Sequence, residues 1–297
     1  TKGGRLAEHA TKSYAVNLLA KLSSFNFCGI PASVNMPCWL DNGQEARHVM
    51  AFANGMAVDV WKYAEALAGN RDPSGAVCAV SPYLFSTDFV AYNFDPNAPE
   101  PQRFLAYLDR VCPQDDVFMT VNHMMGVLLA DVQKYEVFWQ LYGKGANGKT
   151  VLLDIIEALV GRQNVCRVGL EALSPGTRFQ TFPLVTAKVN ISGELPTDMG
   201  SSSMAAMEGE FKHAVSGGNI EVERKGVDKT LDRCRARFVM SGNSLPTFID
   251  RSEAIWRRNR IIPFDVQIPP EERDPDLARH IIETELPGIF NWALQGL

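Results

Sequence analysis

The chain has 297 residues, of which 46% are apolar and 21% charged, and its formal net charge is −5. This composition indicates a soluble, folded protein with one large core or two modest domains, and the negative charge excludes a surface covered in positive potential. No apolar run approaches the ~20 residues of a membrane span, and residues 1–20 lack the apolar region of a signal peptide. We therefore expect an intracellular, cytoplasmic protein without a membrane partner.

The cysteines are widely scattered and include no C-x-x-C pair, so they indicate neither a zinc site nor a disulfide framework. We expect them to be buried thiols. They are Cys28, Cys38, Cys78, Cys112, Cys166 and Cys234.

The first part of the chain alternates short elements and carries no catalytic pattern. Apolar spacing and turn residues predict, in order, a helix at 14–22, mixed pieces at 47–55 and 61–68, paired short strands at 77–94 and helices at 101–111 and 117–132. The last helix is rich in methionine and leucine, which we interpret as packing or subunit contact. A helical collar is thus expected just before the strongest motif of the chain.

That motif is a glycine-rich loop between a predicted strand, residues 137–142, and a helix that Gly161 ends. Its pattern is G-x-x-x-x-G-K-T, in which the backbone N–H groups can surround a triphosphate, Lys149 can reach the β and γ phosphates of ATP, and the Thr150 hydroxyl can bind Mg²⁺. A plain strand-to-helix turn would explain the glycines but not the Lys-Thr pair. The predicted nucleotide-binding residues are Gly143, Lys144, Gly145, Ala146, Asn147, Gly148, Lys149 and Thr150.

An acidic residue follows the next predicted strand. Residues 165–178 look like a polar connector, and residues 184–191 are β-rich and lead to Glu194. Parallel α/β sheets bind ligands just beyond the carboxyl ends of their strands, so Glu194 is a candidate to polarise the attacking water or to support Mg²⁺. Gly193 precedes it where two adjacent acids are usual, and a plain surface glutamate at a strand end remains the alternative.

A hairpin with basic residues at its tip is predicted next, from a strand at 220–223, a turn at 224–229 and a return strand. Residues 237–242 form a further strand that ends at Asn243, whose amide could orient water against the γ-phosphate. The alternative is a turn asparagine that caps the strand.

Two adjacent arginines, Arg257 and Arg258, precede an apolar run at 261–264. They could be charges at a helix end, or one of them could reach a neighbouring subunit's nucleotide as an arginine finger. For the late basic residues as a group, a solvated face balanced by nearby acids is the alternative to a nucleic-acid contact.

Taken together, GKGANGKT, NISGELP, FKHAVSGGNIEVERKG, FVMSGNSLP and WRRNRIIPF, in this order and spacing, resemble the superfamily 3 DNA helicases, and most of all their phage and virus primase-helicase branch. The match is dense over residues 142–264 and weaker upstream. The resemblance implies an α/β fold: a P-loop, AAA+-like core with a central, mostly parallel sheet flanked by helices. A smaller mixed or helical N-terminal domain would precede it, with boundaries at 1–115 and 116–297.

The resemblance also implies an activity and roles for residues. A hexameric ring would hydrolyse ATP between its subunits and move 3′ to 5′ along single-stranded DNA, in the replication of a phage or mobile element. Glu194 would be the Walker B acid and Asn243 the sensor, with Arg257 or Arg258 as the finger. The residues implied to contact DNA are Lys225 near the hairpin tip, Lys229 beside it, and Lys212 in the family's additional motif.

Other functions are also compatible with these patterns. A small-molecule kinase also uses a phosphate loop, although it would need a lid and an acceptor pocket. An ATP-dependent oligomeric platform could bind or melt DNA without processive unwinding. A primase module or a loading protein could act as a further partner of the chain.

Overall fold

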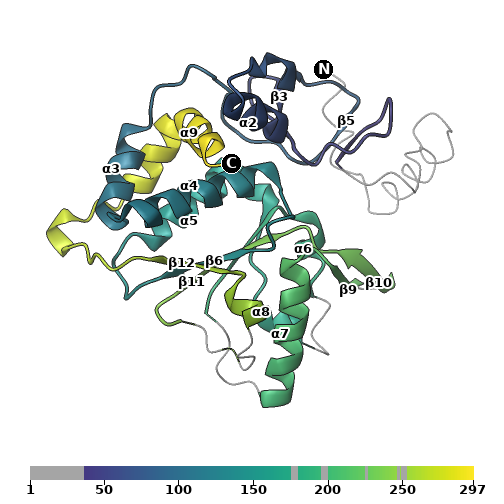
Figure 1. The fold of residues 1–297 in the computed structure, drawn as a ribbon, viewed down its shortest axis with the longest axis vertical. Helices are drawn as coiled ribbons and strands as arrows, with labels where there is room; N and C mark the ends of the chain where they lie inside the picture. Colours follow the sequence, from purple (N-terminus) through teal and green to yellow (C-terminus); the bar gives the residue numbers. More distant parts are fainter. Residues whose placement is uncertain (1–36, 175–179, 195–199, 225–226, 246–247, 249–252) are drawn as a thin grey trace, which may run out of the picture.

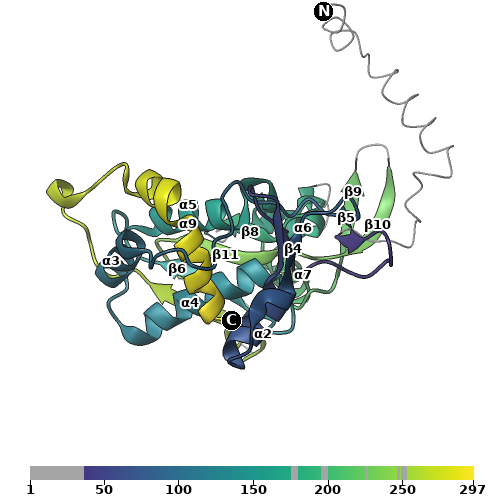
Figure 2. The ribbon, with the colours of Figure 1, turned by 90° about the horizontal axis from the view of Figure 1, so that it is seen from above.

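The computed structural model describes residues 37–174, 180–194, 200–224, 227–245, 248 and 253–297 (Figure 1). The helix predicted at 14–22 and Lys225 at the hairpin tip lie outside these residues. Within them, helices cover both faces of a central sheet. The N-terminal part of the chain forms a smaller set of short strands beside it (Figures 1 and 2).

The central sheet has five parallel strands in the order β12-β6-β11-β8-β7. The side chains of its three middle strands are almost entirely buried, as expected where helices cover both faces of a parallel sheet. The predicted α/β fold with a mostly parallel sheet is therefore confirmed. The strands are β6 (Phe138–Tyr142), β7 (Val165–Cys166), β8 (Val189–Ser192), β11 (Arg237–Gly242) and β12 (Asn259–Pro263).

Helices α4 (Asp115–Ala130), α5 (Lys149–Val160) and α9 (Leu277–Gln295) cover one face, and α7 (Ser201–Val215) lies on the other with α6 (Pro183–Thr186) and α8 (Glu253–Trp256) (Figure 1). Alternate side chains of each strand supply the two halves of the core. Leu141 and Val239 pack under α4, α5 and α9, whereas Phe138 and Phe238 pack with Phe211 of α7.

The N-terminal part contains the strands β2 (Val49–Ala51), β3 (Met56–Asp59) and β4 (Val77–Ala79), the pair β1 (Cys38–Trp39) and β5 (Leu84–Phe85), and the helix α2 (Val60–Ala68). The helix α3 (Gln102–Val111) follows. Phe52 and Phe94 pack against Phe290 of α9, and the Tyr92 hydroxyl donates to the Leu159 carbonyl of α5 over 2.9 Å. One apolar core thus runs from Met50 to Leu294, across residue 115.

Three local predictions differ from the structure. Residues 183–186 form a helical turn rather than a strand, because Pro183 fixes the first helical position, and β8 begins only at Val189. The predicted connector at 165–178 contains the edge strand β7. Beyond that strand, the Asn190 side chain takes the place of the backbone hydrogen bonds between strands. It accepts from the Val168 N–H at 2.7 Å and donates to the Val168 carbonyl at 2.9 Å.

The strands within residues 77–94 exist, but they do not pair with each other. β4 pairs with β3, and β5 pairs with β1. Their partners lie earlier in the chain, which a local turn signal cannot reveal. The predicted hairpin exists, with β9 (Asn219–Arg224) antiparallel to β10 (Val227–Arg233), but the strands extend into residues 224 and 227–229, where the turn was predicted.

Candidate functional site

The phosphate loop joins β6 to α5 at the carboxyl end of the sheet. Gly145, Ala146 and Gly148 have positive φ angles of 43°, 53° and 91°. A Cβ on Gly148 would lie 3.0 Å from the Val111 side chain, and one on Gly143 would overlap the Phe264 carbonyl oxygen. The glycines are therefore required both by backbone conformation and by the close approach of α3 and of the chain after β12.

Lys149 stands inside this loop, with 8% of its surface exposed. Its Nζ donates to the Gly143 carbonyl, to Asn147 Oδ1 at 3.2 Å and to Asn243 Oδ1 at 3.5 Å. Burial lowers the pKa of the Lys149 ammonium, while the negative charge of Glu194 acts in the opposite direction. The Lys149 ammonium is thus held by neutral carbonyl and amide oxygens, which a phosphate could replace.

Glu194 and Asn243 come from neighbouring strands and meet at the mouth of the loop. Glu194 Oε1 accepts hydrogen bonds from the backbone N–H of Asn243 and, at 3.2 Å, of Ser244. The hydrogen bond from the Asn243 backbone N–H lowers the pKa of the Glu194 carboxyl, and the charge of Lys149 lowers it further. Gly242 makes room for this contact, since a Cβ there would lie 2.7 Å from Glu194 Cγ.

Asn243 also reaches the loop, because its Oδ1 accepts from the Gly145 amide at 3.4 Å. β8, β11 and β6 are adjacent in the sheet, which explains why residues almost 100 positions apart meet here. The structure brings Lys149, Glu194 and Asn243 together, as the sequence patterns indicated separately.

A cavity of about 390 Å³ extends from this cluster. The Tyr107 hydroxyl donates to the Gly148 carbonyl at 2.9 Å, and the Ile268 amide donates to the Ala146 carbonyl at 2.9 Å. Sequence reasoning missed these residues, since none belongs to a motif and all lie in α3 or beyond β12. Outside α5, the missed lining residues are Tyr107, Ile268, Glu272, Arg273, Asp274 and Leu277.

The donor set at this cavity suits Mg²⁺. Thr150 is exposed at the first turn of α5 and lines the cavity, and the Glu194 carboxylate contacts Asn243, which lines it too. Among the residues that the structure describes, no group of three or more His, Cys, Asp or Glu could hold a metal on its own. One hydroxyl and one carboxylate agree with the usual way Mg²⁺ is held, by few protein oxygens together with substrate phosphates.

The two candidate fingers lie at the other end of the sheet. β12 runs parallel to β6, with Asn259 opposite Phe138 and Pro263 opposite Tyr142, so the residues before β12 are at the amino end. Arg258 is fixed there: it pairs with Glu136 at 2.6 Å and donates to the Ala254 carbonyl at 2.7 Å. Arg257 is exposed, and no hydrogen bond or ion pair of its side chain is found among the described residues.

The candidate DNA-contacting residues are not gathered at the cavity. Lys229 lies on β10, where it forms ion pairs with Glu221 at 3.1 Å and Glu223 at 2.5 Å, and its bonds to Glu223 and then Glu221 raise its pKa. Lys212 is half-buried in the last turn of α7. The hairpin itself projects from the molecule (Figure 2), and the buried Ile220 and Val222 hold its base.

The sequence is similar to one protein family and to a viral protein. Residues 141–258 match a family of unknown function, DUF5906, a range that contains the phosphate loop, Glu194, Asn243 and both arginines. The chain is 24% identical over 204 residues to "Putative helicase 121R" of Invertebrate iridescent virus 3, a match over 66% of this chain and 20% of that protein. The chain thus spans about a fifth of the length of that relative.

Solved structures share the fold. The apo structure of the NrS-1 C-terminal region superposes with a TM-score of 0.55 at 17% identity, over 69% of this chain and 48% of that one. A second apo form of the same region gives 0.53 at 15% identity, over the same shares. The core therefore shares the fold of this region, and its sequence is similar to that of a putative viral helicase. In the part of the chain that the structure describes, no helix is both long and apolar enough to cross a membrane.

Proposed function

We propose that this chain is the ATP-hydrolysing motor of a ring-shaped DNA helicase that moves 3′ to 5′ on single-stranded DNA. The ring is a homo-oligomer, a hexamer by resemblance, and works in the cytoplasm in the replication of a phage or mobile element. A primase module or a loader would be a further partner.

One observation carries the proposal. The Lys149 ammonium, the Glu194 carboxylate and the Asn243 amide lie together at the carboxyl ends of adjacent parallel strands, beside a cavity of about 390 Å³. This is the arrangement that nucleotide hydrolysis requires: a cation for the phosphates, an acid that can accept a proton from water, and an amide that can orient the water. Mg²⁺, held by Thr150 and Glu194, would neutralise phosphate charge.

The position of Arg257 supports hydrolysis at a junction between subunits. A five-residue strand such as β12 spans ~16 Å, which is longer than an arginine side chain, so Arg257 at its amino end is too far from the phosphate loop of its own subunit. An exposed arginine without a described partner is free to enter a neighbour's site. Arg258, tied to Glu136, is the poorer candidate for the finger.

The hairpin β9–β10 supports the DNA contact. In a ring, each subunit would place one hairpin in the central channel, so a few basic residues repeated around the ring could follow the phosphates without reading bases. Lys225 is the first candidate for that contact. Lys229 would contribute only after leaving Glu221 and Glu223.

The test is ATP hydrolysis with and without single-stranded DNA, followed by strand displacement. The parent protein should show DNA-stimulated hydrolysis and 3′-to-5′ unwinding, and Lys149→Ala should abolish both because the β and γ phosphates lose their cation. Hydrolysis without displacement would indicate the oligomeric platform instead. Phosphate transfer to a small molecule, without stimulation by DNA, would indicate a kinase.

Junction chemistry has its own test. Arg257→Ala and Lys149→Ala proteins, each inactive alone, should regain part of the activity when mixed, since mixed rings contain junctions with an intact loop and an intact finger. Loss of a finger costs about 10³ to 10⁵ in rate in related chemistry. Arg258→Ala serves as the control. Its main effect should be a lower free energy of unfolding, with a smaller effect on the activity regained in the mixing experiment.

A further inference from the structure

The edge strand β12 separates two charged regions of opposite sign. Arg257 stands before it and Arg260 lies at its start, and no carboxylate partner of either is found in the described part of the chain. After it, the segment 265–276 contains five acids and one arginine. The strand lies at the edge of the sheet, with Arg260 and Ile261 exposed on it.

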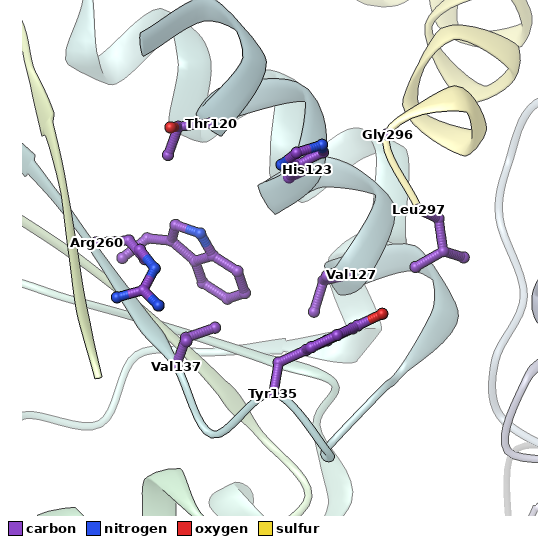
Figure 3. Close-up of a pocket in the computed structure, with 9 residues that line it drawn as sticks. Thr120, His123, Val127, Tyr135, Val137, Arg260, Gly296 and Leu297 are labelled. Atoms are coloured by element: carbon purple, nitrogen blue, oxygen red, sulfur yellow. The ribbon is translucent and has the colours of Figure 1, made fainter. Parts of the chain in front are cut away.

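Arg260 lines a cavity of about 350 Å³ between α4, the start of β6 and the end of α9 (Figure 3). Its Nη1 donates to the backbone carbonyls of Arg257, at 2.8 Å, and of Asn259, at 3.3 Å. The guanidinium is thus held in place by backbone atoms, and no bond of its Nε or Nη2 is found among the described residues. A fixed cation with open donor positions is suited to bind a carboxylate.

The surroundings of Arg260 are mostly apolar and partly exposed, with Thr120 and His123 as polar lining residues. Val137 and Tyr135 line the cavity, and Tyr135 is 42% exposed (Figure 3). On the same helix as the lining residues Thr120 and His123, Met119 is 56% exposed. Apolar side chains clustered around one cation are typical of a protein interface.

The acidic segment after β12 offers the complementary group. It extends to the tip of the molecule in both views (Figures 1 and 2). Within it, Glu272 already pairs with Arg110 at 2.6 Å and Asp276 with Arg279 at 3.1 Å. Glu271 is exposed on the short turn Pro270–Glu272, and no cation partner is found for it within the described ranges.

We propose that the Arg260 cavity receives the acidic turn around Glu271 of a second copy of this chain. The two surfaces lie on different parts of the molecule, so the contact is head-to-tail, and contacts of this kind form a ring when the rotation between subunits closes. Charge complementarity identifies the occupant: each side has a charge that its own chain leaves without a described partner, and the signs are opposite.

The proposal rests on the proposed ring and makes it specific. The cavity is joined to Arg257 through the Arg260–Arg257 hydrogen bond, while the acidic turn borders the nucleotide cavity through Glu272 and Arg273. An Arg257 that enters a neighbour's nucleotide site therefore brings Arg260 toward that neighbour's acidic turn. Arg260 acts here as a positioning residue, because it holds the backbone of Arg257 and anchors the neighbour.

Charge reversal tests the pairing. Sedimentation velocity with a non-hydrolysable ATP analogue gives the concentration at which subunits assemble. Arg260→Glu and Glu271→Arg should each raise that concentration about 10-fold or more, since like charges then face each other, and the double variant should restore it because every junction regains one pair. Arg71→Glu, the same reversal at an exposed site of the N-terminal part, should leave assembly unchanged.

A second measurement does not depend on the effect of charge on folding. In a Cys78→Ala background, which removes an exposed thiol, a mixture of Arg260→Cys and Glu271→Cys proteins should form a disulfide between copies in the presence of nucleotide. Each variant alone should not.

Three outcomes would overturn the inference. The single reversals could assemble at the same concentration as the parent, or the double variant could fail to restore assembly. In the third, single-stranded DNA added alone would protect the thiol of Arg260→Cys from an alkylating reagent. In each case rescue in the Arg257→Ala and Lys149→Ala mixture would still support the proposed function. A parent that remains monomeric with nucleotide and DNA would contradict the ring itself.

Discussion

The contact between Tyr107 and Gly148 makes a residue of α3 part of the phosphate loop. The Tyr107 hydroxyl donates to the Gly148 carbonyl at 2.9 Å, and its ring lies against the place where a Cβ of Gly148 would be. A hydrogen bond of this kind contributes about 1 kcal/mol, or a factor of about 5 in an equilibrium constant. Tyr107→Phe should therefore weaken ATP binding about 3- to 10-fold, measured by calorimetry, with little change in kcat.

Tyr83→Phe is the matched control for that measurement, because Tyr83 is 56% exposed in the N-terminal part. It should leave ATP binding as in the parent. Equal binding by both variants would mean that the loop keeps its shape without α3.

Glu194 combines two properties that one substitution can separate. Its Oε1 accepts two backbone N–H groups, a contact that a glutamine oxygen can keep, while only the carboxylate can accept a proton from water. Glu194→Gln should bind ATP like the parent and hydrolyse it about 10² to 10⁴ times more slowly, measured in single turnover. Loss of ATP binding in this variant would instead assign the carboxylate mainly to Mg²⁺.

The pKa of Glu194 adds a prediction about pH. The Asn243 amide and Lys149 lower that pKa, so the carboxylate remains ionised below the ordinary Glu value of about 4.3. The acid limb of kcat/KM against pH, which reports the free enzyme, should lie below that value, within the range where the protein is folded. Asn243→Ala leaves the backbone bond in place and should not move this limb.

Two carboxylates of the hairpin compete with DNA for Lys229. Lys229 is held by Glu221 and Glu223, so phosphates must displace two carboxylates before they can bind it. Replacing both with glutamine should strengthen single-stranded DNA binding and increase the salt dependence of the affinity by about one phosphate contact. A salt titration by fluorescence anisotropy measures both quantities.

Asp232→Asn on the same hairpin is the control, since Asp232 accepts from Thr230 and forms no described ion pair with Lys229. The further change of Lys225 and Lys229 to alanine should reduce DNA binding and unwinding while basal ATP hydrolysis persists. Unchanged DNA binding in that variant would place the DNA contact elsewhere.

Elements with a strong local signal were predictable, and those set by distant partners were not. The phosphate loop, β11 and the hairpin follow from glycine positions and apolar runs, and α3 and α4 from helical spacing. α9 was missed because Pro287 and Gly288 interrupt its pattern, whereas the structure tolerates them where the helix packs closely on Pro99. The position of Glu194 could be inferred, but its contact with Asn243 depends on strand order, which local patterns do not encode.

A buried ionic cluster joins the N-terminal part to the sheet. Asp88, which follows β5, contacts Lys188 at 3.2 Å and Arg235, and the side chains of Asp88 and Lys188 are 0% exposed. Arg235 also pairs with Asp131 at 2.7 Å. Lys188 and Arg235 precede β8 and β11, so the cluster lies at the amino end of the sheet, just beyond the base of the hairpin.

Breaking this cluster should destabilise the chain as a whole. Asp88→Asn leaves Lys188 buried without its carboxylate, and the removal of one partner of a buried pair costs about 3 to 5 kcal/mol. Glu283→Gln breaks an exposed pair with Arg279, both about half-exposed, and should cost about 0 to 1 kcal/mol. Urea unfolding of both variants measures the difference, and equal losses would show that the cluster contributes no more than a surface pair.

The same cluster predicts how stability responds to acid. Burial alone would raise the pKa of Asp88, but the charges of Lys188 and Arg235 outweigh it and lower that pKa below the ordinary value. A carboxyl whose pKa is lower in the folded state stabilises the protein above the unfolded pKa of about 3.9, and this contribution is lost as the pH falls through the folded pKa. The parent should therefore lose stability below about pH 4 more steeply than Asp88→Asn, which has no carboxyl to protonate at this position. Parallel acid titrations followed by circular dichroism test this, and identical slopes in that range would assign acid unfolding to other carboxyls.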